Sequence, residues 1–321
     1  MLQDKVLYIL EKNRDKVVTG GEIARQLGVS RNAVWKVVNS LREKGNKIES
    51  LPNRGYRLAV DSDGLCKQII QEFLTTERLG TTIELIETIH STNTYLKEQD
   101  LNTLQEGYVV LADEQTGGRG RLNRHFLSPR HSGVYLSVLL KPDLPPDKSR
   151  LLTICAAVAV SKALQSVCGV GSRIKWVNDI FVDSKKICGI LTEASLSAEM
   201  QSLDYVIIGI GINTGKIPEE IEDIATSVLE VTGKQGFRNR LVAEVLNQLE
   251  KIYFDYLLAG READILTAYS ERLIYINEKV LVKMPADTFE AVVLGIDETG
   301  NLIVEKEGGR VIHINTGEIN V

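Results

Sequence analysis

The 321-residue sequence predicts a multidomain α+β protein. The chain is longer than one typical hydrophobic core supports, so two or three domains are expected. Residues 1–60 carry a net charge of +6, whereas the remainder carries −11. Hydrophobic residues follow a helical spacing near the N-terminus, an alternation of strands and helices in the middle, and short alternating strands at the end. We therefore expect domains over residues 1–63, 64–272 and 273–321.

The composition restricts the class of protein. Hydrophobic residues make up 43% of the chain and charged residues 25%, which excludes disorder and fibrous repeats. The apolar run Leu151–Val160 is interrupted by Ser161 and is too short to span a bilayer. No basic segment precedes an apolar core at the N-terminus, so we expect a cytoplasmic protein without a membrane partner. The four cysteines are scattered, which favours reduced thiols over a disulfide or a zinc site.

The N-terminal region has the pattern of two helices joined by a glycine turn. The first of them follows Thr19, a good N-cap, and ends at Gly28, where glycine tolerates the left-handed conformation of a C-cap. Ser30 is a favourable N-cap for the next helix, Arg31–Lys44. This arrangement is typical of a helix-turn-helix.

The second of these helices has an apolar face and a polar face. The polar face alone fits either DNA contact or simple solvation. Two short strands, Ile48–Leu51 and Gly55–Leu58, then form a small wing, and together with the local positive charge they favour DNA binding. The region resembles a winged helix. Its candidate DNA-binding residues are Ser30, Arg31, Asn32, Trp35, Lys36 and Asn39 on the helix and Arg54 at the wing tip.

A linker at residues 61–64 leads into the central region, which alternates strands and helices up to about residue 270. Strands are expected at Ile83–Ile89, Tyr108–Asp113, Gly133–Leu140, Arg173–Trp176, Lys186–Ala194 and Tyr205–Ile212, and helices at Ser91–Gln99, Ser149–Val167 and Arg238–Leu258. The C-terminal region predicts a small β-barrel-like unit with strands at Lys279–Lys283, Phe289–Ile296, Leu302–Glu305 and Arg310–Ile314.

The segment Gly117–Arg124 combines three glycines with three arginines and follows a predicted strand. Glycine lets backbone N–H groups approach an anion, and arginine offers forked donors to phosphate or carboxylate. The segment matches neither the P-loop nor the dinucleotide-binding pattern. A flexible basic surface loop is the alternative, but it is disfavoured in a region of net negative charge.

Four further segments combine polar groups with glycine or strand ends. Ser91, Thr92 and Asn93 directly follow a strand and can begin a helix, whose N-terminus attracts carboxylates. Lys175-Trp176-Val177-Asn178-Asp179 closes another strand, and a lysine opens the strand containing Gly189, where glycine often marks close approach by a ligand. Gly209 and Gly211 clear one face of a strand for a flat group, and Asn213 follows them. Taken singly, the first segment is better explained as an ordinary cap and the third as a solvated strand start, and the second is only weak evidence against a strand–turn boundary.

In this order, these features resemble the biotin–protein ligases, and with the winged helix they resemble the bifunctional bacterial class that also represses the biotin operon. The most specific parts are Gly118–Arg121 with Arg124, then residues 175–179 and 186–191. Asn123 stands where the family usually has glycine, and Val177 where it usually has proline. Asn tolerates a left-handed backbone, so the loop should keep its geometry, whereas Val177 should leave the strand end less rigid.

The resemblance implies the fold, the reaction and the role of each residue. The central domain should share the mixed sheet of class II aminoacyl-tRNA synthetases and lipoate ligases, and the C-terminal domain an SH3-like barrel. Biotin and ATP should give biotinyl-5′-AMP in the presence of Mg²⁺. The biotin-binding candidates are Ser91, Thr92, Asn93, Gln115, Gly118, Arg119, Gly120, Arg121, Lys186 and Gly189, of which Lys186, Arg119 and Arg121 are the catalytic candidates. The ATP and adenylate candidates are Arg121, Arg124, Lys175, Trp176, Asn178, Asp179 and Asn213, with Asp179 the weak candidate for Mg²⁺.

The resemblance also implies partners. The acceptor should be a biotin carboxyl carrier domain of acetyl-CoA carboxylase or pyruvate carboxylase. A homodimer with bound biotinyl-5′-AMP should bind operator DNA. Three alternatives stay open: a ligand-sensing repressor without catalysis, a lipoate-type ligase, and a ligase whose winged helix no longer represses. The complete cation set disfavours the first, and the loop together with the winged helix disfavours the second.

Overall fold

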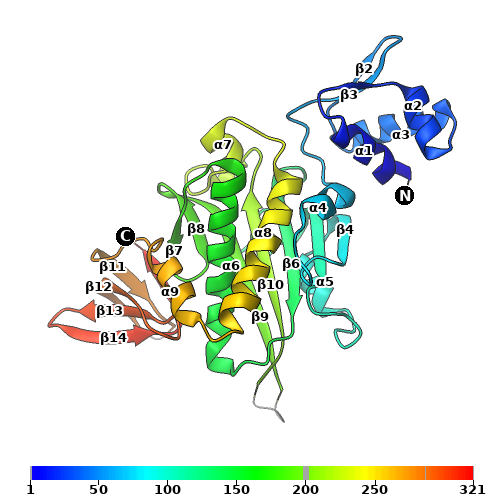
Figure 1. The fold of residues 1–321 in the computed structure, drawn as a ribbon. Helices are drawn as coiled ribbons and strands as arrows, with labels where there is room; N and C mark the ends of the chain where they lie inside the picture. Colours follow the sequence, from blue (N-terminus) through cyan, green and yellow to red (C-terminus); the bar gives the residue numbers. More distant parts are fainter. Residues whose placement is uncertain (1, 198–201, 286, 321) are drawn as a thin grey trace.

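The computed structural model describes residues 2–197, 202–285 and 287–320. Along the chain these residues form a small N-terminal unit, a central sheet covered by helices, and a second, smaller sheet that ends the chain (Figure 1). The N-terminal helical unit lies at one end of the central region and the C-terminal sheet lies at the other (Figure 1).

The N-terminal unit is a helix-turn-helix followed by a wing, as predicted. Thr19 caps α2 through a capping box with Glu22, Gly28 ends α2 with a left-handed φ of 64°, and the Ser30 hydroxyl accepts from the backbone N–H of Ala33 at 3.1 Å. The elements are α1 (Leu2–Lys12), β1 (Val17–Val18), α2 (Gly20–Leu27), α3 (Arg31–Glu43), β2 (Ile48–Leu51) and β3 (Gly55–Leu58), and the strands form an antiparallel sheet of order β1-β3-β2.

A seven-stranded mixed sheet organises the central region. Its order is β4-β5-β6-β10-β9-β8-β7, and only the β4–β5 pair is parallel. The strands are β4 (Ile83–Ile89), β5 (Val109–Gln115), β6 (Gly133–Leu140), β7 (Arg173–Lys175), β8 (Asp179–Val182), β9 (Lys185–Ser197) and β10 (Ser202–Asn213). The helices are α4 (Lys67–Phe73), α5 (Thr92–Lys97), α6 (Ser149–Ala163), α7 (Val228–Thr232), α8 (Arg238–Ile252) and α9 (Glu262–Ser270).

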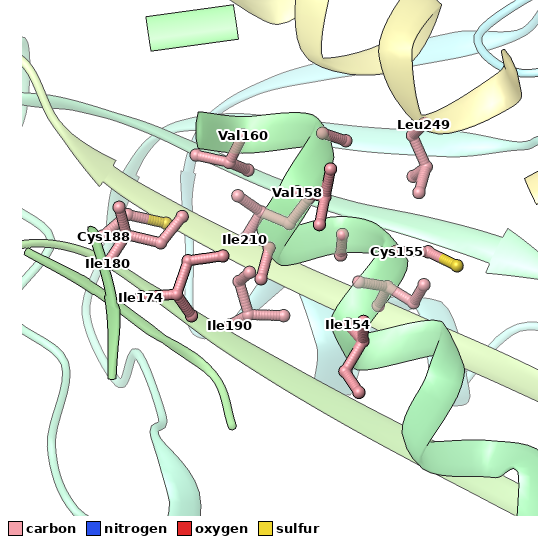
Figure 2. Close-up of a cluster of buried hydrophobic side chains, with 14 of the residues drawn as sticks. Ile154, Cys155, Val158, Val160, Ile174, Ile180, Cys188, Ile190, Ile210 and Leu249 are labelled. Carbon is pink, nitrogen blue, oxygen red and sulfur yellow. The ribbon is translucent and has the colours of Figure 1, made fainter. Parts of the chain in front are cut away.

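Long helices cover one face of this sheet, and α5 lies on the other. Helices α6 and α8 pack over the first face (Figure 1), and Figure 2 shows Ile154 and Val158 of α6 lying against Ile190 and Ile210 of the strands. The segment Pro146–Cys168 is long and apolar enough to cross a membrane, but 72% of its most apolar window is buried in this core. On the opposite face, Leu96 of α5 packs in a much smaller cluster. Residues on that face are therefore free to form a site.

The C-terminal sheet shares its core with the central region. Its strands, in the order β14-β13-β12-β11-β15, are β11 (Lys279–Lys283), β12 (Thr288–Ile296), β13 (Leu302–Lys306), β14 (Arg310–Ile314) and β15 (Glu318–Asn320). Val282, Val293 and Ile319 belong to the same buried cluster as α6. The sheet is thus fixed against the central region, and β15 lies beside the candidate site.

Several elements differ from the sequence-based expectation. Strand β7 ends at Lys175, one residue earlier than expected, and residues 176–178 make the turn to β8, with a cis peptide bond between Trp176 and Val177. Helices α6 and α8 end earlier than expected, each continuing as a π-helical turn. Helices α4, α7 and α9 and strands β1, β8 and β15 were not predicted. Cys66 and Ile69, at the start of α4, pack in the N-terminal core, so that core extends past the expected linker.

Candidate active site

The site lies on the sheet face that carries α5. Cross-strand partners point to the same face of a sheet, and Ser137 of β6 pairs with Gly209 of β10, which pairs with Leu191 of β9. The small side chains of Ser137 and Gly209 lower the surface of the sheet beneath α5. The hollow is a cavity of about 50 Å³, room for only a few water molecules. Of the candidate residues, it is lined by Ser91, Thr92, Asn93, Gln115, Arg119, Gly120, Arg121, Asn178, Lys186 and Gly189.

One end of the cavity is a hydrogen-bonded group of uncharged side chains. Ser91 caps α5, accepting from the backbone N–H of Thr94, so that Thr92 and Asn93 occupy the first turn. Both the backbone N–H of Thr92, at 2.9 Å, and its Oγ1, at 3.1 Å, lie within hydrogen-bond distance of Gln115 Oε1. Gln115 Nε2 donates to Ser128 Oγ at 2.9 Å. The end of β5 and the start of α5 are therefore held together by their own polar groups.

Asn93 extends this group across the sheet. Its Oδ1 lies 2.5 Å from Ser137 Oγ, and its Nδ2 donates to Glu193 Oε2 at 2.8 Å. The other oxygen of Glu193 accepts from Lys97 Nζ at 2.7 Å. Burial raises the pKa of Glu193, but the hydrogen bonds from Lys97 and Asn93 outweigh it, and the net pKa is lowered. Ser137 and Glu193 were not recognised in the sequence.

The other end of the cavity is cationic. Lys186 Nζ lies 2.8 Å from Asp179 Oδ1 and 5.9 Å from the ring centroid of Phe126. Asn178 Nδ2 donates to the same Asp179 oxygen at 2.8 Å and to the carbonyl of Ile190 at 3.0 Å. Lys186 is thus held at the cavity by a carboxylate that is itself fixed by the β7–β8 hairpin.

The arginine–glycine loop, residues 117–124, folds over the cavity and reaches the C-terminal sheet. Arg121 donates to Asn178 Oδ1 at 2.9 Å and to the carbonyl of Gly317 at 3.3 Å, and Arg124 pairs with Glu318 at 2.6 Å. Arg119 is exposed. Leu122 takes a left-handed φ of 54°, next to Asn123, the position where such a backbone was expected to be tolerated.

The remaining candidates lie outside the lining of the cavity: Gly118, Arg124, Lys175, Trp176, Asp179 and Asn213. Lys175 donates to Asn320 Oδ1 at 3.1 Å, and burial lowers the pKa of this lysine. The buried Trp176 donates its indole N–H to the carbonyl of Gly300 at 3.0 Å, which fixes the hairpin to the C-terminal sheet. Asn213 Nδ2 donates to the carbonyl of Thr226. In this structure the polar groups of Lys175, Trp176 and Asn213 therefore bond to other parts of the chain.

The two strand glycines make room for side chains of the protein itself. A Cβ on Gly209 would lie 2.3 Å from Asn93 Oδ1, and one on Gly211 would lie 2.4 Å from the ring of Phe126. Both glycines also line the cavity, so the expectation that they clear space for a flat ligand stays a prediction. Gly189 also lies beneath the Phe126 ring and the Lys186 side chain. Phe126 is a cavity-lining residue that the sequence reading missed, although it directly follows the arginine–glycine loop.

The described residues contain no group of three or more His, Cys, Asp or Glu side chains that could hold a metal ion. Asp179, the weak Mg²⁺ candidate, already pairs with Lys186 and Asn178. A single carboxylate so engaged does not make a protein-built Mg²⁺ site.

The polar face of α3 is open to solvent. Trp35 is 52% exposed, and Ser30, Arg31, Asn32 and Lys36 are exposed as well. Asn39 is half-buried and accepts from Arg42, which also bonds to the carbonyl of Ile48 at 2.7 Å and so fixes the wing to the helix. Arg54 is exposed at the wing tip.

The end of α3 contacts the central region through an ion pair between Lys44 and Glu87, at 3.1 Å, and through one histidine. His131 Nδ1 lies 2.8 Å from Asp113 Oδ2, and the His131 ring lies so close to Gly45 that a Cβ there would meet Nε2 at 2.3 Å. Asp113 also pairs with the fully buried Arg238 at 2.6 Å. Asp113 lies two residues before Gln115 on β5, so this contact joins the strand that enters the site to the helix-turn-helix.

Three family models match this chain. The biotin/lipoate A/B protein ligase family matches residues 85–213, a helix-turn-helix domain matches residues 2–57, and the biotin protein ligase C-terminal domain matches residues 275–321. The bifunctional ligase/repressor BirA of Bacillus subtilis is 35% identical over 96% of this chain and 95% of its own length. That of Escherichia coli is 27% identical over 90% of this chain and 88% of its own length.

The fold has the same relatives. The biotin protein ligase from Aquifex aeolicus, solved in complex with biotin and ATP, is 30% identical, with a TM-score of 0.65 over 75% of this chain and 98% of that one. The arrangement of the three matched regions agrees with the N-terminal unit, mixed sheet and C-terminal sheet described above. The chain therefore belongs to the family of the bifunctional biotin–protein ligase/repressors.

Proposed function

We propose that this chain activates biotin with ATP and transfers it to a lysine of a carrier domain. In the first step a carboxylate oxygen of biotin attacks the α-phosphorus of ATP, and the bond to pyrophosphate breaks to give biotinyl-5′-AMP. In the second step the lysine amine attacks the acyl carbon, AMP leaves with the bonding electron pair, and the amine loses a proton.

The observation that carries this proposal is the polarity of one small cavity. Uncharged donors and acceptors on α5 and β5 line one end, and Lys186 with Arg119 and Arg121 lines the other. This division suits a ligand with a polar, uncharged ring system and an anionic tail. An anion that attacks a polyanion needs fixed positive charge, because the repulsion must be offset in the transition state.

Most of the candidate residues have a role in this scheme. Ser91, Thr92, Asn93 and Gln115 hold the ureido ring. Lys186 stabilises charge between the biotin carboxylate and the α-phosphate. Arg119 and the backbone of Gly120 and Arg121 cover the biotin tail and the α-phosphate. Arg121 and Arg124 bind phosphates. Mg²⁺ enters with the phosphates of ATP, and Asn178, Lys175, Trp176 and Asn213 lie near the nucleotide.

The loop 117–124 acts as a lid in this scheme. A glycine-rich loop costs entropy to order, and bound adenylate would order it and keep water from a hydrolysable anhydride. Limited proteolysis with and without biotin plus ATP tests this role. Equal cleavage rates at the loop would refute it.

Regulation follows from the same intermediate. Biotinyl-5′-AMP accumulates when no carrier awaits biotin, so a dimer that it stabilises would bind a two-fold operator through α3 and the wing. The exposed face of Arg31, Asn32, Trp35 and Lys36 supports this second function. In a gel-shift assay, operator affinity that did not respond to biotin plus ATP would refute the coupling. We place both functions in the cytoplasm.

The ligase proposal is tested with Lys186→Ala and the neighbouring Lys185→Ala, whose Nζ instead donates to the carbonyl of Glu222. The Lys186 variant should lose on the order of 100- to 1000-fold in biotin-dependent pyrophosphate exchange, whereas the Lys185 variant should keep its activity. Equal activities in the two variants would refute the assigned role. A wild-type chain that transfers lipoate but not biotin would refute the function itself.

A further inference from the structure

The buried polar groups beside the cavity leave each amide only one orientation. Asn93 Nδ2 lies 2.8 Å from a carboxylate oxygen of Glu193 and 3.4 Å from the carbonyl oxygen of Leu191. Both of these groups only accept hydrogen bonds. The lowered pKa of Glu193, with Lys97 paired to its other oxygen, keeps this carboxylate ionised near neutral pH. Asn93 must therefore direct its Oδ1 toward Ser137.

The orientation of Asn93 fixes two hydroxyl protons. Ser137 is fully buried, and its Oγ lies 2.5 Å from Asn93 Oδ1 and 2.7 Å from Thr92 Oγ1. A serine has one proton to donate, and the amide oxygen has none. Ser137 therefore donates to Asn93, and the short contact with Thr92 requires Thr92 to donate to Ser137.

Gln115 is oriented independently. Ser128 Oγ donates to the carbonyl of Phe126 at 3.0 Å, so it accepts from Gln115 Nε2 at 2.9 Å. Gln115 Oε1 is thereby directed at Thr92, 3.1 Å from its Oγ1. Because the Thr92 proton is directed to Ser137, Thr92 Oγ1 and Gln115 Oε1 lie side by side at the cavity as two acceptors without a proton between them. A ligand N–H placed there would bond to both.

We propose that Glu193 and Ser137 are positioning residues that, through Asn93, hold the Thr92 hydroxyl as an acceptor and so select ligands that offer an N–H group. This inference rests on the proposed ligase function. A ureido ring supplies such N–H groups at the uncharged end of the ligand. The dithiolane ring of lipoate supplies none, so it would leave both oxygens desolvated and unpaired. Buried polar groups left unpaired in this way give a site its strongest discrimination against a ligand.

The test compares biotin with its N-methyl derivatives, each lacking one ureido N–H, by calorimetric titration of the full chain. In the wild-type protein, biotin should bind more tightly than the derivative methylated at the nitrogen facing Thr92. Glu193→Gln lets Asn93 turn over, because glutamine can donate where the carboxylate could only accept. Asn93 would then donate to Ser137, Ser137 would donate to Thr92, and the Thr92 hydroxyl would be free to donate to Gln115. Ser137→Ala removes the link itself. In both variants the ratio of the two affinities should fall on the order of tenfold.

Lys97→Arg is the matched control, since it changes the partner of Glu193 but keeps a cation beside the carboxylate. It should keep the wild-type ratio. Any steric cost of the methyl group is the same in each variant and cancels when the affinity ratios are compared. If Glu193→Gln fails to fold, Ser137→Ala alone tests the proposal. An unchanged ratio in the folded variants would overturn the relay while leaving the ligase proposal intact. Failure of the wild-type chain to bind biotin would instead overturn the proposed function.

Discussion

Arg238 is a fully buried cation whose removal should destabilise the central region severely. Its Nη2 lies 2.6 Å from Asp113 Oδ1, its Nε donates to the carbonyl of Gly133 at 2.8 Å, and its Nη1 donates to the carbonyl of Asp63 at 2.9 Å. The guanidinium thus joins β5, β6 and the segment that follows the wing. Arg238→Met fills most of the volume but leaves a buried carboxylate and two carbonyls without this donor.

The expected size of the loss follows from what remains for Asp113. Breaking a buried ion pair by removing one partner costs about 3–5 kcal/mol. Asp113 keeps its contact with His131 at 2.8 Å, and its side chain is 12% exposed. We therefore expect the lower end, about 3 kcal/mol in the free energy of unfolding. For a region of this size, that corresponds to a fall in Tm of about 6–12 °C.

The two tryptophans allow a clean assay. Trp176 is 3% exposed in the central region, whereas Trp35 is 52% exposed in the helix-turn-helix. In a Trp35→Phe background, urea unfolding followed by fluorescence reports on Trp176 alone. Adding Asp113→Asn to Arg238→Met should recover about 1 kcal/mol or more of the summed single losses, because the double variant buries no unpaired charge. Strict additivity, or a loss below about 1 kcal/mol in the single variant, would refute the buried-pair argument.

Three further outcomes are expected. Burial raises the pKa of Asp113, but its bonds to His131 and Arg238 outweigh this effect, and the net pKa lies below 3.8. The carboxylate therefore stabilises the fold above pH 3.8, and this contribution is lost as the pH falls through the lowered pKa. In an acid titration, the stability of Asp113→Asn should depend less on pH than that of the wild type. Gly45→Ala combines a φ of 84° with a clash against His131, so it should cost about 1–3 kcal/mol and speed protease cleavage of the segment at residues 61–64. Lys36→Ala should weaken operator binding and reduce its salt dependence by about one phosphate contact, with unchanged ligase activity.

The sequence predicted elements whose signals are local. Thr19, Gly28 and Ser30 cap their helices where expected, and Gly133–Leu140 is a strand along its whole predicted length. Helix α7 was missed although Ser227 caps it and Gly233 ends it with a left-handed φ of 70°, because it is only five residues long. Other missed elements lack such signals. Helix α4 begins after Cys66, which makes no side-chain cap hydrogen bond, and α9 begins after Arg261, which makes none either. Strand β15 has only three residues and depends on pairing with β11.

The residues of the candidate site likewise fall into those that local sequence patterns predict and those that they do not. Residues in polar motifs next to strand ends, such as Thr92, Gln115 and Lys186, could be selected from the sequence and do line one cavity. Ser137 could not, because it stands inside a continuous apolar strand where a single serine carries no pattern. Its role depends on the cross-strand register with Gly209 and on the placement of α5 above both. Contacts of this kind arise from tertiary structure, which composition and spacing do not encode locally.

The two ends of the cavity differ in how firmly their polar groups are held, and the difference suits their tasks. Thr92, Asn93 and Ser137 are buried and bonded to one another, so they are preorganised and pay little entropy when a ligand binds. Beyond the cationic end, outside the cavity lining, Arg124 is paired through a single exposed contact with Glu318, its side chain being 67% exposed. Such a surface pair is worth about 1 kcal/mol or less, so an incoming phosphate can displace Glu318 at small cost. The uncharged end of the cavity is thus rigid, which lets the site select its first substrate strictly. The arginine that meets the phosphates is easily released from its partner, which lets the same site exchange nucleotide and pyrophosphate at each turnover.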